Sequence, residues 1–347
     1  MRILHFLAFT LMAIAPLVAS AQTDTSTSRG GGTLSLYFEN DLFAGTDRYY
    51  TNGVKAGWST TDLEKFSDTP YASPMLPLLN AIPFLNKPEF QKNLTFTFGQ
   101  NIYTPNNLQI SAPQPHDRPY AGWLYGGVGI VVKDADFRSS FGLDIGMVGP
   151  ASLAQEAQTV VHTIRGFPVP QGWSNQLHNE PGLVAAYELS WRWPRHERRA
   201  GLGWDFIPHT GFDVGNIYDY ADLGAELRVG INLPDDFGTP NIGSTSSTPT
   251  SVEGSQQAQR VSSFDFGAYL FARVEGRAIA RNIFLDGNTF ENSASVPKKW
   301  DVADLSVGAS VNYKNTKLTY AFVYRTEEFK GQDGGQLFGS VTATFAF

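Results

Sequence analysis

The side chains best suited to chemistry gather in one short stretch near the start of the chain. Residues 39–53 carry three acidic groups, two Asn and the hydroxyl of Thr51, with Asn40 and Asp41 adjacent. Because the flanking segments alternate apolar and polar residues, this stretch is predicted to form the tip of a β-hairpin. Carboxylate, amide and backbone oxygens held close together suit a hard cation such as Ca²⁺. Asx residues also form turns without any metal, and the spacing does not match the EF-hand loop, so the pattern alone leaves a plain turn open.

A second group of candidate residues lies on a predicted helix in the segment 150–181. Ser152 followed by Gln155 matches a capping box, and Gly166 is a typical helix end. At helical spacing one face is apolar and the opposite face is polar. The apolar face consists of Leu153, Ala157, Val160, Val161 and Ile164, and the polar face of Gln155, Gln158, Thr159 and His162. We expect the apolar face to pack and the polar face to display His162, which can take a proton from water near neutral pH. An incidental surface His would give the same pattern.

About twelve segments with strand-like alternation must position these residues. They cover roughly residues 33–40, 50–61, 92–103, 120–134, 138–149, 182–193, 199–213, 219–232, 263–279, 299–312, 316–329 and 335–347. Most are close to the 9–11 residues with which a tilted strand crosses a bilayer. A soluble sandwich also alternates, but a last strand that ends on Phe347 resembles the outer-membrane barrels of Gram-negative bacteria. The predicted fold is therefore all-β, with about twelve antiparallel strands in a transmembrane β-barrel and a helix in an extracellular loop.

The chain ends and the composition agree with this fold class. Arg2, an apolar core from Leu4 to Val18 and an A-x-A sequence at 19–21 predict a secretory signal peptide over 1–21, which leaves 22–347 for the barrel. No later run is apolar enough for a transmembrane helix. A net charge of -7 without a Lys/Arg block argues against a nucleic-acid partner. Because the chain has no cysteine, its stability must come from packing and pairing rather than disulfides.

An even number of strands places both chain ends in the periplasm and three of the longer connections outside. The outward loops are 41–49, 104–119 and 150–181. The segments 61–91 and 234–262 fall on the periplasmic side, the first with a short helix near 75–79 and the second as a flexible excursion. Charged residues of both signs on inward positions predict a paired, filled lumen rather than an open pore. These residues are Glu188, Arg192, Glu226, Arg228, Asp265, Arg273, Glu275 and Arg325.

A third group of candidate residues ends the second outward loop. Arg118 has the charge to bind a phosphate, and Tyr120, Trp123 and Tyr125 are residues expected in an interfacial aromatic belt. A rim of aromatic residues with an Asp117–Arg118 pair would explain the same sequence without a ligand.

Three stretches together resemble a known family. They are Glu39-Asn40-Asp41 through Thr51-Asn52-Gly53; Gln100-Asn101-Ile102-Tyr103-Thr104-Pro105 with Asp117-Arg118-Pro119-Tyr120-Ala121-Gly122; and Gly149-Pro150 through Gln155-Glu156-Ala157-Gln158 and His162, with Gly172-Trp173 and Gln176. In this order they resemble the LpxR family of outer-membrane lipid A 3'-O-deacylases, over essentially the whole mature chain.

The resemblance implies a twelve-stranded barrel and a calcium-dependent carboxylic ester hydrolase whose site faces outward, between the wall and a loop helix. Its substrate would be lipid A of lipopolysaccharide, among the lipids of the outer membrane. The residues assigned in this way are, as catalytic groups, His162, Asn40, Thr51 and Gln158; for the metal, Asp41; and for the substrate, Arg118. Family members can carry a Lys in the second outward loop. Here residues 105–116 contain neither Lys nor Arg, and Arg118 is the nearest cation.

The chemistry also fits the residues themselves. Ester hydrolysis needs an activated water and a stabilised oxyanion. His162 can act as the general base, and a metal at Asp41 can polarise the ester carbonyl, as in secreted phospholipase A2. No G-x-S-x-G elbow is present and no Ser adjoins His162, which disfavours an outer-membrane phospholipase with a Ser–His pair. A non-catalytic barrel, either a pore or an adhesin, is the alternative from another class. The oligomeric state and the acyl-chain specificity stay open.

Overall fold

The computed structural model describes residues 31–194, 201–239, 241–250 and 266–347. The predicted signal peptide at 1–21 lies outside these residues. The part from Gly32 to Phe347 forms one compact unit. Everything below refers to this unit.

Twelve antiparallel strands close into a barrel in sequence order, which confirms the predicted fold class. The strands are β1 Gly32–Asn40, β2 Tyr49–Thr60, β3 Gln91–Thr104, β4 Ala121–Lys133, β5 Phe137–Val148, β6 Glu180–Trp191, β7 Leu202–Gly215, β8 Tyr218–Ile231, β9 Phe266–Asn282, β10 Asp301–Tyr313, β11 Thr316–Arg325 and β12 Gln336–Ala346. The pairing of β1 with β12, from Thr33 opposite Ala346 to Asn40 opposite Gly339, closes the ring. Closure leaves no strand edge unpaired, as a lipid environment requires.

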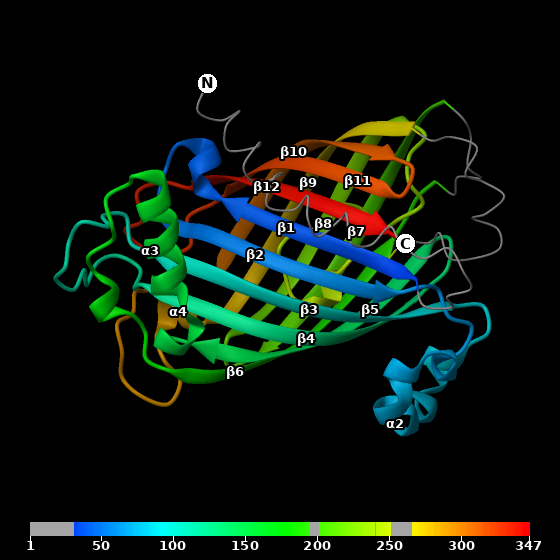
Figure 1. Ribbon diagram of the computed structural model, residues 1–347, viewed down its shortest axis with the longest axis horizontal. Helices are drawn as coiled ribbons and strands as arrows, with labels where there is room; N and C mark the ends of the chain where they lie inside the picture. Colours follow the sequence, from blue (N-terminus) through cyan, green and yellow to red (C-terminus); the bar gives the residue numbers. More distant parts are fainter. Residues whose placement is uncertain (1–30, 195–200, 240, 251–265) are drawn as a thin grey trace. The chain divides into compact units, whose positions relative to one another are not determined.

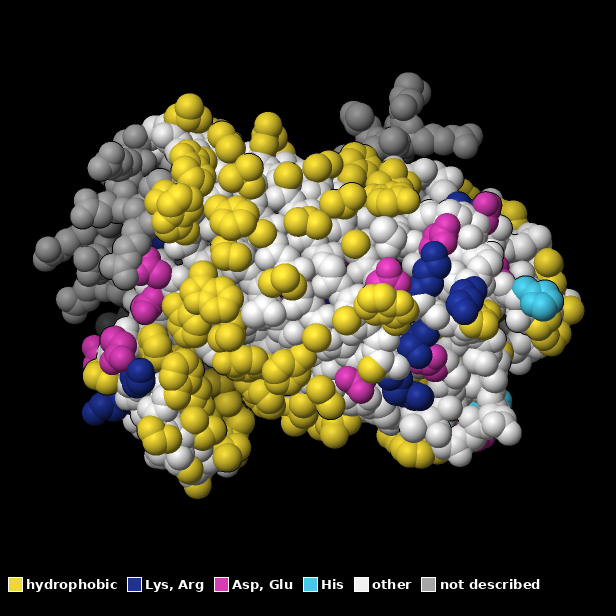
Figure 2. Space-filling model, turned by 180° about the vertical axis from the view of Figure 1, so that it is seen from behind, with side chains coloured by type: hydrophobic (Ala, Val, Ile, Leu, Met, Phe, Trp, Pro, Cys, Tyr) yellow, Lys and Arg dark blue, Asp and Glu magenta, His cyan; other side chains and the backbone are white. Residues whose placement is uncertain are grey.

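Side chains of each strand alternate between the lumen and an apolar exterior. On β1, Tyr37 and Glu39 point inward, where Tyr37 meets the Lys55 ammonium, while Leu36 and Phe38 face out. Large apolar side chains such as Leu223, Leu270 and Val307 are exposed on the outside. Figure 2 shows these hydrophobic side chains spread over the barrel wall. This arrangement is that of a membrane-spanning barrel.

The lumen is filled by paired charges, as predicted. Arg228 is fully buried and forms ion pairs with Asp205, at 2.6 Å, and with Asp236. Arg277 and Arg325 both pair with Asp304, at 2.6 and 2.8 Å. Asp265, which was also predicted to face inward, lies outside the described residues.

The segment after β8 was predicted to be a periplasmic excursion, and this is wrong for its described part. The backbone N–H groups of Thr239 and Ile242 donate to the inward-facing carboxylates of Glu226 and Glu39, both at 2.9 Å. The ammonium of Lys55 donates to the carbonyl oxygens of Gly243 and Ser244, at 3.0 Å each. Residues 241–250 therefore lie inside the barrel, because the buried charges of the wall need partners that the segment's backbone supplies. The rest of the predicted excursion, at 251–262, lies outside the described residues.

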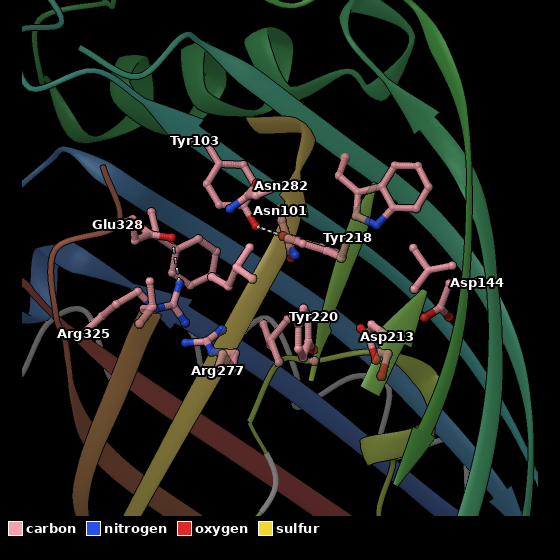
Figure 3. Close-up of a pocket in the computed structure, with 18 of the residues that line it drawn as sticks. Asn101, Tyr103, Asp144, Asp213, Tyr218, Tyr220, Arg277, Asn282, Arg325 and Glu328 are labelled. Atoms are coloured by element: carbon pink, nitrogen blue, oxygen red, sulfur yellow. Dashed lines mark hydrogen bonds and ion pairs between the residues drawn. The ribbon is translucent and has the colours of Figure 1, made fainter. Parts of the chain in front are cut away.

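A cavity of about 80 Å³ remains in the lumen beside this segment. Asp144 and Asp213 lie on one side of it, and Arg277, Arg325 and Glu328 on the other (Figure 3). Trp123 and Tyr125 line it as well, so their predicted place in an outer aromatic belt is wrong. Their strand register turns them inward, where their rings stack at 5.7 Å.

Short helices join the strands at both ends. They are η1 Asp41–Ala44, η2 Phe66–Asp68, η3 Pro70–Met75, α2 Leu76–Ala81, η4 Pro83–Asn86, η5 Pro150–Ser152, α3 Ala154–Arg165, η6 Trp173–Asn175, η7 Thr245–Ser247 and α4 Ile283–Asp286. Figure 1 shows α3 and α4 at one end of the barrel and α2 at the other, the end where Phe347 lies. Among the described residues, no helix combines the length and hydropathy needed to span a membrane. The predicted helices in the third outward loop and near 75–79 are both present.

The buried charge network predicts a large effect for Arg228→Ala. Removing this guanidinium leaves Asp205 and Asp236 without their shared cation. Breaking a buried ion pair in this way costs about 3–5 kcal/mol of folding stability. We expect a clearly lower urea midpoint for loss of the heat-modifiable folded form on gels. Lys330→Ala removes the same charge from an exposed position and serves as the control. Equal midpoints for the two variants would contradict the network's role in stability.

Candidate active site on the outer wall

Helix α3 lies against the outer face of β3 and β4 at the end of the barrel that carries the predicted outward loops (Figure 1). The Gln100 amide on β3 donates to the Ser152 carbonyl just before the helix, at 2.6 Å. Ala154, in the first turn, packs with Ile102 and Tyr120. The absence of a side chain at Gly122 permits this approach, since a Cβ there would lie 2.3 Å from the Cβ of Ala154.

The helix begins differently from the prediction and ends as predicted. Leu153 is the N-cap, in a left-handed conformation with φ of 58° and no capping side chain, so the predicted capping box is wrong. The Ser152 hydroxyl donates instead to the Gly149 carbonyl at 2.6 Å, which closes the preceding turn η5. Gly166 ends the helix with φ of 69°, where glycine avoids the strain of a left-handed conformation.

The two faces of α3 are largely inverted relative to the prediction. The apolar residues Leu153, Val160, Val161 and Ile164 are exposed by 53, 55, 46 and 71%. Gln158 and His162, in contrast, are 4% exposed each and face the barrel. Ala157 packs and Gln155 is exposed, as predicted. The reason for the inversion is that the neighbouring loops offer polar partners to Gln158 and His162, whereas the exterior of the barrel is apolar.

His162 is held through both ring nitrogens. Its Nδ1 lies 2.8 Å from the carbonyl oxygen of Pro168, and its Nε2 lies 3.3 Å from Oδ2 of Asp47 in the first outward loop. Burial lowers the pKa of His162, but the bonds to Asp47 and Pro168 outweigh it and raise this pKa above its ordinary 6.5. Since the Pro168 carbonyl can only accept, Nδ1 carries a proton, and Nε2 beside the Asp47 carboxylate is the nitrogen at which the ring gains or loses its second proton.

The first outward loop presents a carboxylate with a free oxygen. Asp41 is fully buried, and its Oδ2 accepts the backbone N–H of Arg48 at 2.5 Å. Its Oδ1 is buried and accepts no hydrogen bond. Burial, with a further contribution from the charge of Asp47, raises the pKa of Asp41 well above its ordinary range. The neighbouring Asn40 caps η1 by accepting the Leu42 N–H at 2.8 Å, which fixes the direction in which Asp41 leaves the strand.

Thr51 reaches the same outer face through a β-bulge. Tyr50 is opposite Tyr103 and Asn52 is opposite Ile102, so Thr51 is the extra residue of β2. Its hydroxyl lies 2.6 Å from the Thr104 hydroxyl. The bulge thus sends Tyr50 into the lumen and keeps Thr51 on the outside.

Gln158, one turn before His162, is fixed by Trp173. Its Oε1 accepts the indole N–H at 2.8 Å. Its Nε2 is buried and has no acceptor. The buried face of α3 therefore holds an unused amide donor beside a histidine, in a place where a ligand could accept from it.

One predicted member of the site, Arg118, and one further acidic residue of the first stretch, Glu39, lie elsewhere. Glu39, one of the three acidic groups of the first stretch, points into the lumen and accepts from the Tyr50 hydroxyl at 2.9 Å. Arg118 is also fully buried, paired with Glu328 at 3.0 Å and stacked 4.7 Å from the centre of the Tyr103 ring. The structure thus brings Arg118 to the inner side of the wall and not to His162, and its role in substrate binding stays a prediction.

Sequence reasoning also missed two residues. Asp47 was counted among the acidic groups but was given no role, although it is the partner of His162. Arg48 follows it and extends a partly exposed guanidinium to Asn106 at 3.1 Å. The presence of Asp47 close to Asn40 and Asp41 in sequence could have suggested a role for it. The position of α3 over that loop could not be inferred from the sequence.

The site is separate from the cavity in the lumen. None of Asn40, Asp41, Thr51, Gln158 and His162 lines that cavity. A base on a buried helix face, a carboxylate with a free oxygen and an amide donor are the kinds of group that attack of water on a carbonyl uses.

The family described as outer membrane protein LpxR matches residues 4–347. The chain belongs to the LpxR family. With twelve strands and an apolar exterior, it is a multi-pass protein of the Gram-negative outer membrane.

One solved structure shares the fold of this chain. LpxR from Salmonella typhimurium is 23% identical, with a TM-score of 0.71 over 91% of this chain and 100% of that chain. The β domain of the Bordetella autotransporter BrkA is 10% identical, with a TM-score of 0.38 over 92% of this chain and 99% of that chain. No curated protein sequence matches this LpxR-family chain significantly.

The contact at Gly122 predicts how α3 responds to a single methyl group. In Gly122→Ala the new Cβ meets the side chains of Ser152 and Ala154 at the start of α3, and overpacking of this kind costs about 1–3 kcal/mol. We expect hydrogen exchange of the α3 amides to accelerate while the barrel stays heat-modifiable. Gly126→Ala is the matched control, because its nearest neighbour would be an oxygen at 3.6 Å. Unchanged exchange in Gly122→Ala would show that the helix does not depend on this contact.

Proposed function

We propose that this protein is a calcium-dependent lipid A 3'-O-deacylase, which hydrolyses the 3'-linked acyloxyacyl ester in the outer leaflet. The observation that carries the proposal is the contact of His162, buried on the inner face of α3, with the partly exposed Asp47 of the first outward loop, whose Oδ2 lies 3.3 Å from Nε2. The first-loop residues Asn40, Asp41 and Thr51 lie on the same outer side. Membership of the LpxR family and the resemblance of its ordered motifs to the deacylases support the choice of substrate.

In the proposed reaction His162 acts as general base. Nε2 takes a proton from a water molecule as the water oxygen bonds to the ester carbonyl carbon. The Asp47 carboxylate beside Nε2 stabilises the positive charge that the ring gains, and the Pro168 carbonyl holds Nδ1–H in the required tautomer. When the intermediate collapses, the bond to the sugar 3'-oxygen breaks, the proton passes from Nε2 to that oxygen, and a fatty acid is released.

The donor set near Asp41 fits calcium. A buried carboxylate with a raised pKa and an oxygen without a hydrogen bond is the environment that a cation stabilises. No cluster of three or more His, Cys, Asp or Glu is present in the part of the chain that the structure describes. Asp41 would therefore share the ion with backbone carbonyls, amide oxygens or water, which calcium accepts. When bound, the ion supplies positive charge to the developing oxyanion.

Two further groups are placed to meet a large amphipathic substrate. The amide donor of Gln158 can donate to the ester or to the attacking water. The exposed apolar face of α3 adjoins the site from the lipid side, where acyl chains lie. For a phosphate of lipid A, the partly exposed Arg48 is better placed than the buried Arg118.

The alternative functions fit the geometry less well. A pore needs an open lumen, but this one is filled by ion pairs and by residues 241–250. A Ser–His phospholipase needs a hydroxyl on the base, whereas the hydrogen-bond partners of His162 within the described residues are a carboxylate and a backbone carbonyl. An adhesin would not need a buried amide donor without an acceptor, nor a buried histidine on the inner face of a helix.

His162→Gln tests the base. Glutamine keeps the size and some hydrogen bonding but cannot carry the proton, so activity should fall by about 10²–10⁴-fold. Mass spectrometry of lipid A from cells with wild-type protein should show loss of the 3'-linked acyloxyacyl group, and cells with the variant or without the gene should retain it. Heat-modifiability on gels controls for folding. Near wild-type deacylation by His162→Gln would refute the mechanism.

The raised pKa of His162 predicts the acid side of the pH profile. Below this pKa the ring is protonated and cannot accept a proton, so the rate should fall as the pH drops through a value above 6.5. Asp47→Asn removes the partner that raises the pKa and should move this limb to lower pH at saturating calcium. A limb that does not move would exclude Asp47 as the partner of the catalytic base.

Chelation tests the metal assignment. EDTA should abolish deacylation, and added Ca²⁺ should restore it in the wild-type protein. Asp41→Ala should remain folded, show weakened Ca²⁺ binding by isothermal titration calorimetry and lose activity. Asp68→Ala removes an exposed carboxylate at the far end of the barrel and serves as the control. Normal turnover of Asp41→Ala at low calcium would show that the metal is absent or held elsewhere.

A further inference from the structure

A small subdomain hangs from the connection between β2 and β3, at the end of the barrel away from α3. We define it as the foot, residues 64–90. It starts after Leu63, which forms a bridge with Lys92, and contains η2, η3, α2 and η4. Residues 70–86 of the foot carry no charged side chain. Nothing in the proposed reaction uses it.

The foot is packed against the outside of the barrel. Phe66, Ala72 and Leu79 form one apolar cluster with Leu94 of β3 and Val132 of β4. Those two strand residues are fully buried by this contact, whereas Phe98, farther along the same outer face of β3, is 60% exposed. The foot is therefore held in a fixed orientation against the outer wall.

A second set of apolar residues in the foot stays exposed. Leu78 is 64% exposed, Tyr71 54%, Ile82 40% and Phe84 37%. Each comes from the uncharged stretch. A cluster of large apolar side chains on a monomer marks a surface that binds something.

The exposed residues are continuous with the aromatic girdle of the barrel. The Tyr71 ring lies 5.2 Å from Trp58 and 6.2 Å from Phe96 on the wall. On the other side, Phe84 lies 6.4 Å from Phe137, which in turn lies 6.0 Å from Trp191. Such aromatic residues mark the level where a barrel leaves the membrane.

The charges of the foot are on its borders. Asp68 precedes the uncharged stretch and Lys87 follows it, with the Lys87 ammonium 5.7 Å from the Phe84 ring centre. Figure 2, seen from behind, shows the foot as the lobe at lower left. Hydrophobic side chains join it to the barrel wall, and charged side chains gather at the left edge. An apolar surface at the level of the girdle, bordered by charge, is the pattern of an interfacial membrane segment.

We propose that the foot is a membrane-binding surface that inserts Tyr71, Leu78, Ile82 and Phe84 among the phospholipids of the periplasmic leaflet. The occupant is lipid because the exposed residues extend the surface that the barrel already buries in the membrane. A second copy of the chain or a periplasmic protein would have to displace lipid from that same surface. This inference does not rest on the enzyme's activity.

Depth-dependent fluorescence quenching tests the proposal on the full mature chain. Because the chain has no cysteine, Leu78→Cys and Glu64→Cys each provide a single site for an NBD label. Both positions are exposed, so the variants should fold, with heat-modifiability as the check. The labelled proteins are reconstituted into phosphatidylethanolamine–phosphatidylglycerol vesicles. Doxyl-labelled phospholipids are then added to one sample and iodide to another.

The expected result is a blue-shifted label at position 78 that doxyl lipids quench several-fold more than the label at position 64. Iodide should quench the two labels in the opposite order. A label at 78 that iodide quenches as well as the one at 64 would overturn the proposal, because the foot would then be in water. A label at 78 that neither agent quenches would also overturn it, since protein would cover the site. Disulfide-linked dimers of unlabelled Leu78→Cys on copper oxidation would point to a second copy and would refute lipid as the occupant.

Discussion

Backbone N–H and C=O groups within a membrane have no water to pair with. The pairing of β1 with β12 gives a partner to the backbone groups at the two strand edges that would otherwise stay open. Closure of the ring has further consequences. Because each side chain must face either lipid or lumen, the charges of twelve strands gather in a narrow interior. There, Arg228, Arg277 and Arg325 are each matched by carboxylates. The remaining demand for partners draws residues 241–250 inward, since backbone carbonyls can satisfy the buried Lys55.

With the interior largely filled, the candidate site residues lie on the outside of the wall. This is an unusual place for polar side chains, because the barrel exterior is apolar. Helix α3 covers these polar side chains. Its polar face, the wall and the first loop enclose His162 and Gln158. Its apolar face points outward and takes the place of the apolar wall surface that the helix covers. Burial also strengthens each charge interaction there, which is why Asp47 can raise the pKa of His162 despite desolvation.

The fold was largely predictable from sequence because strand alternation is a local signal. A period of two over each strand, together with loop lengths, is enough to count the strands and assign most faces. The site was predictable only in part. Asn40, Asp41, Thr51, Gln158 and His162 are all brought to the outer side, but their roles remain to be tested. Which face of α3 is buried could not be derived from the sequence. An amphipathic helix buries whichever face finds partners, and those partners come from loops far away in sequence.

The same limit explains the other differences. Arg118 was expected to meet a substrate phosphate because it lies in the second outward loop, but Glu328 and the Tyr103 ring hold it on the inner side of the wall. Trp123 and Tyr125 looked like belt residues by type alone, yet their register on β4 turns them inward. The inserted segment at 241–250 had the composition of a linker, and its contacts depend on charges carried by β1, β2 and β5, namely Glu39, Lys55 and Asp144. In each case the deciding interaction lies between segments that no local pattern connects.

The bulge at Thr51 has a consequence for the tolerance of β2 to deletion. The extra residue changes the phase of β2, so that Tyr50 fills the lumen while the hydroxyl of Thr51 stays outside. Deletion of Thr51 would leave Tyr50 and Asn52 in simple alternation on their present faces, with the pairing to β3 intact. A single in-frame deletion would thus remove this hydroxyl from the outer wall without disturbing the closure of the barrel.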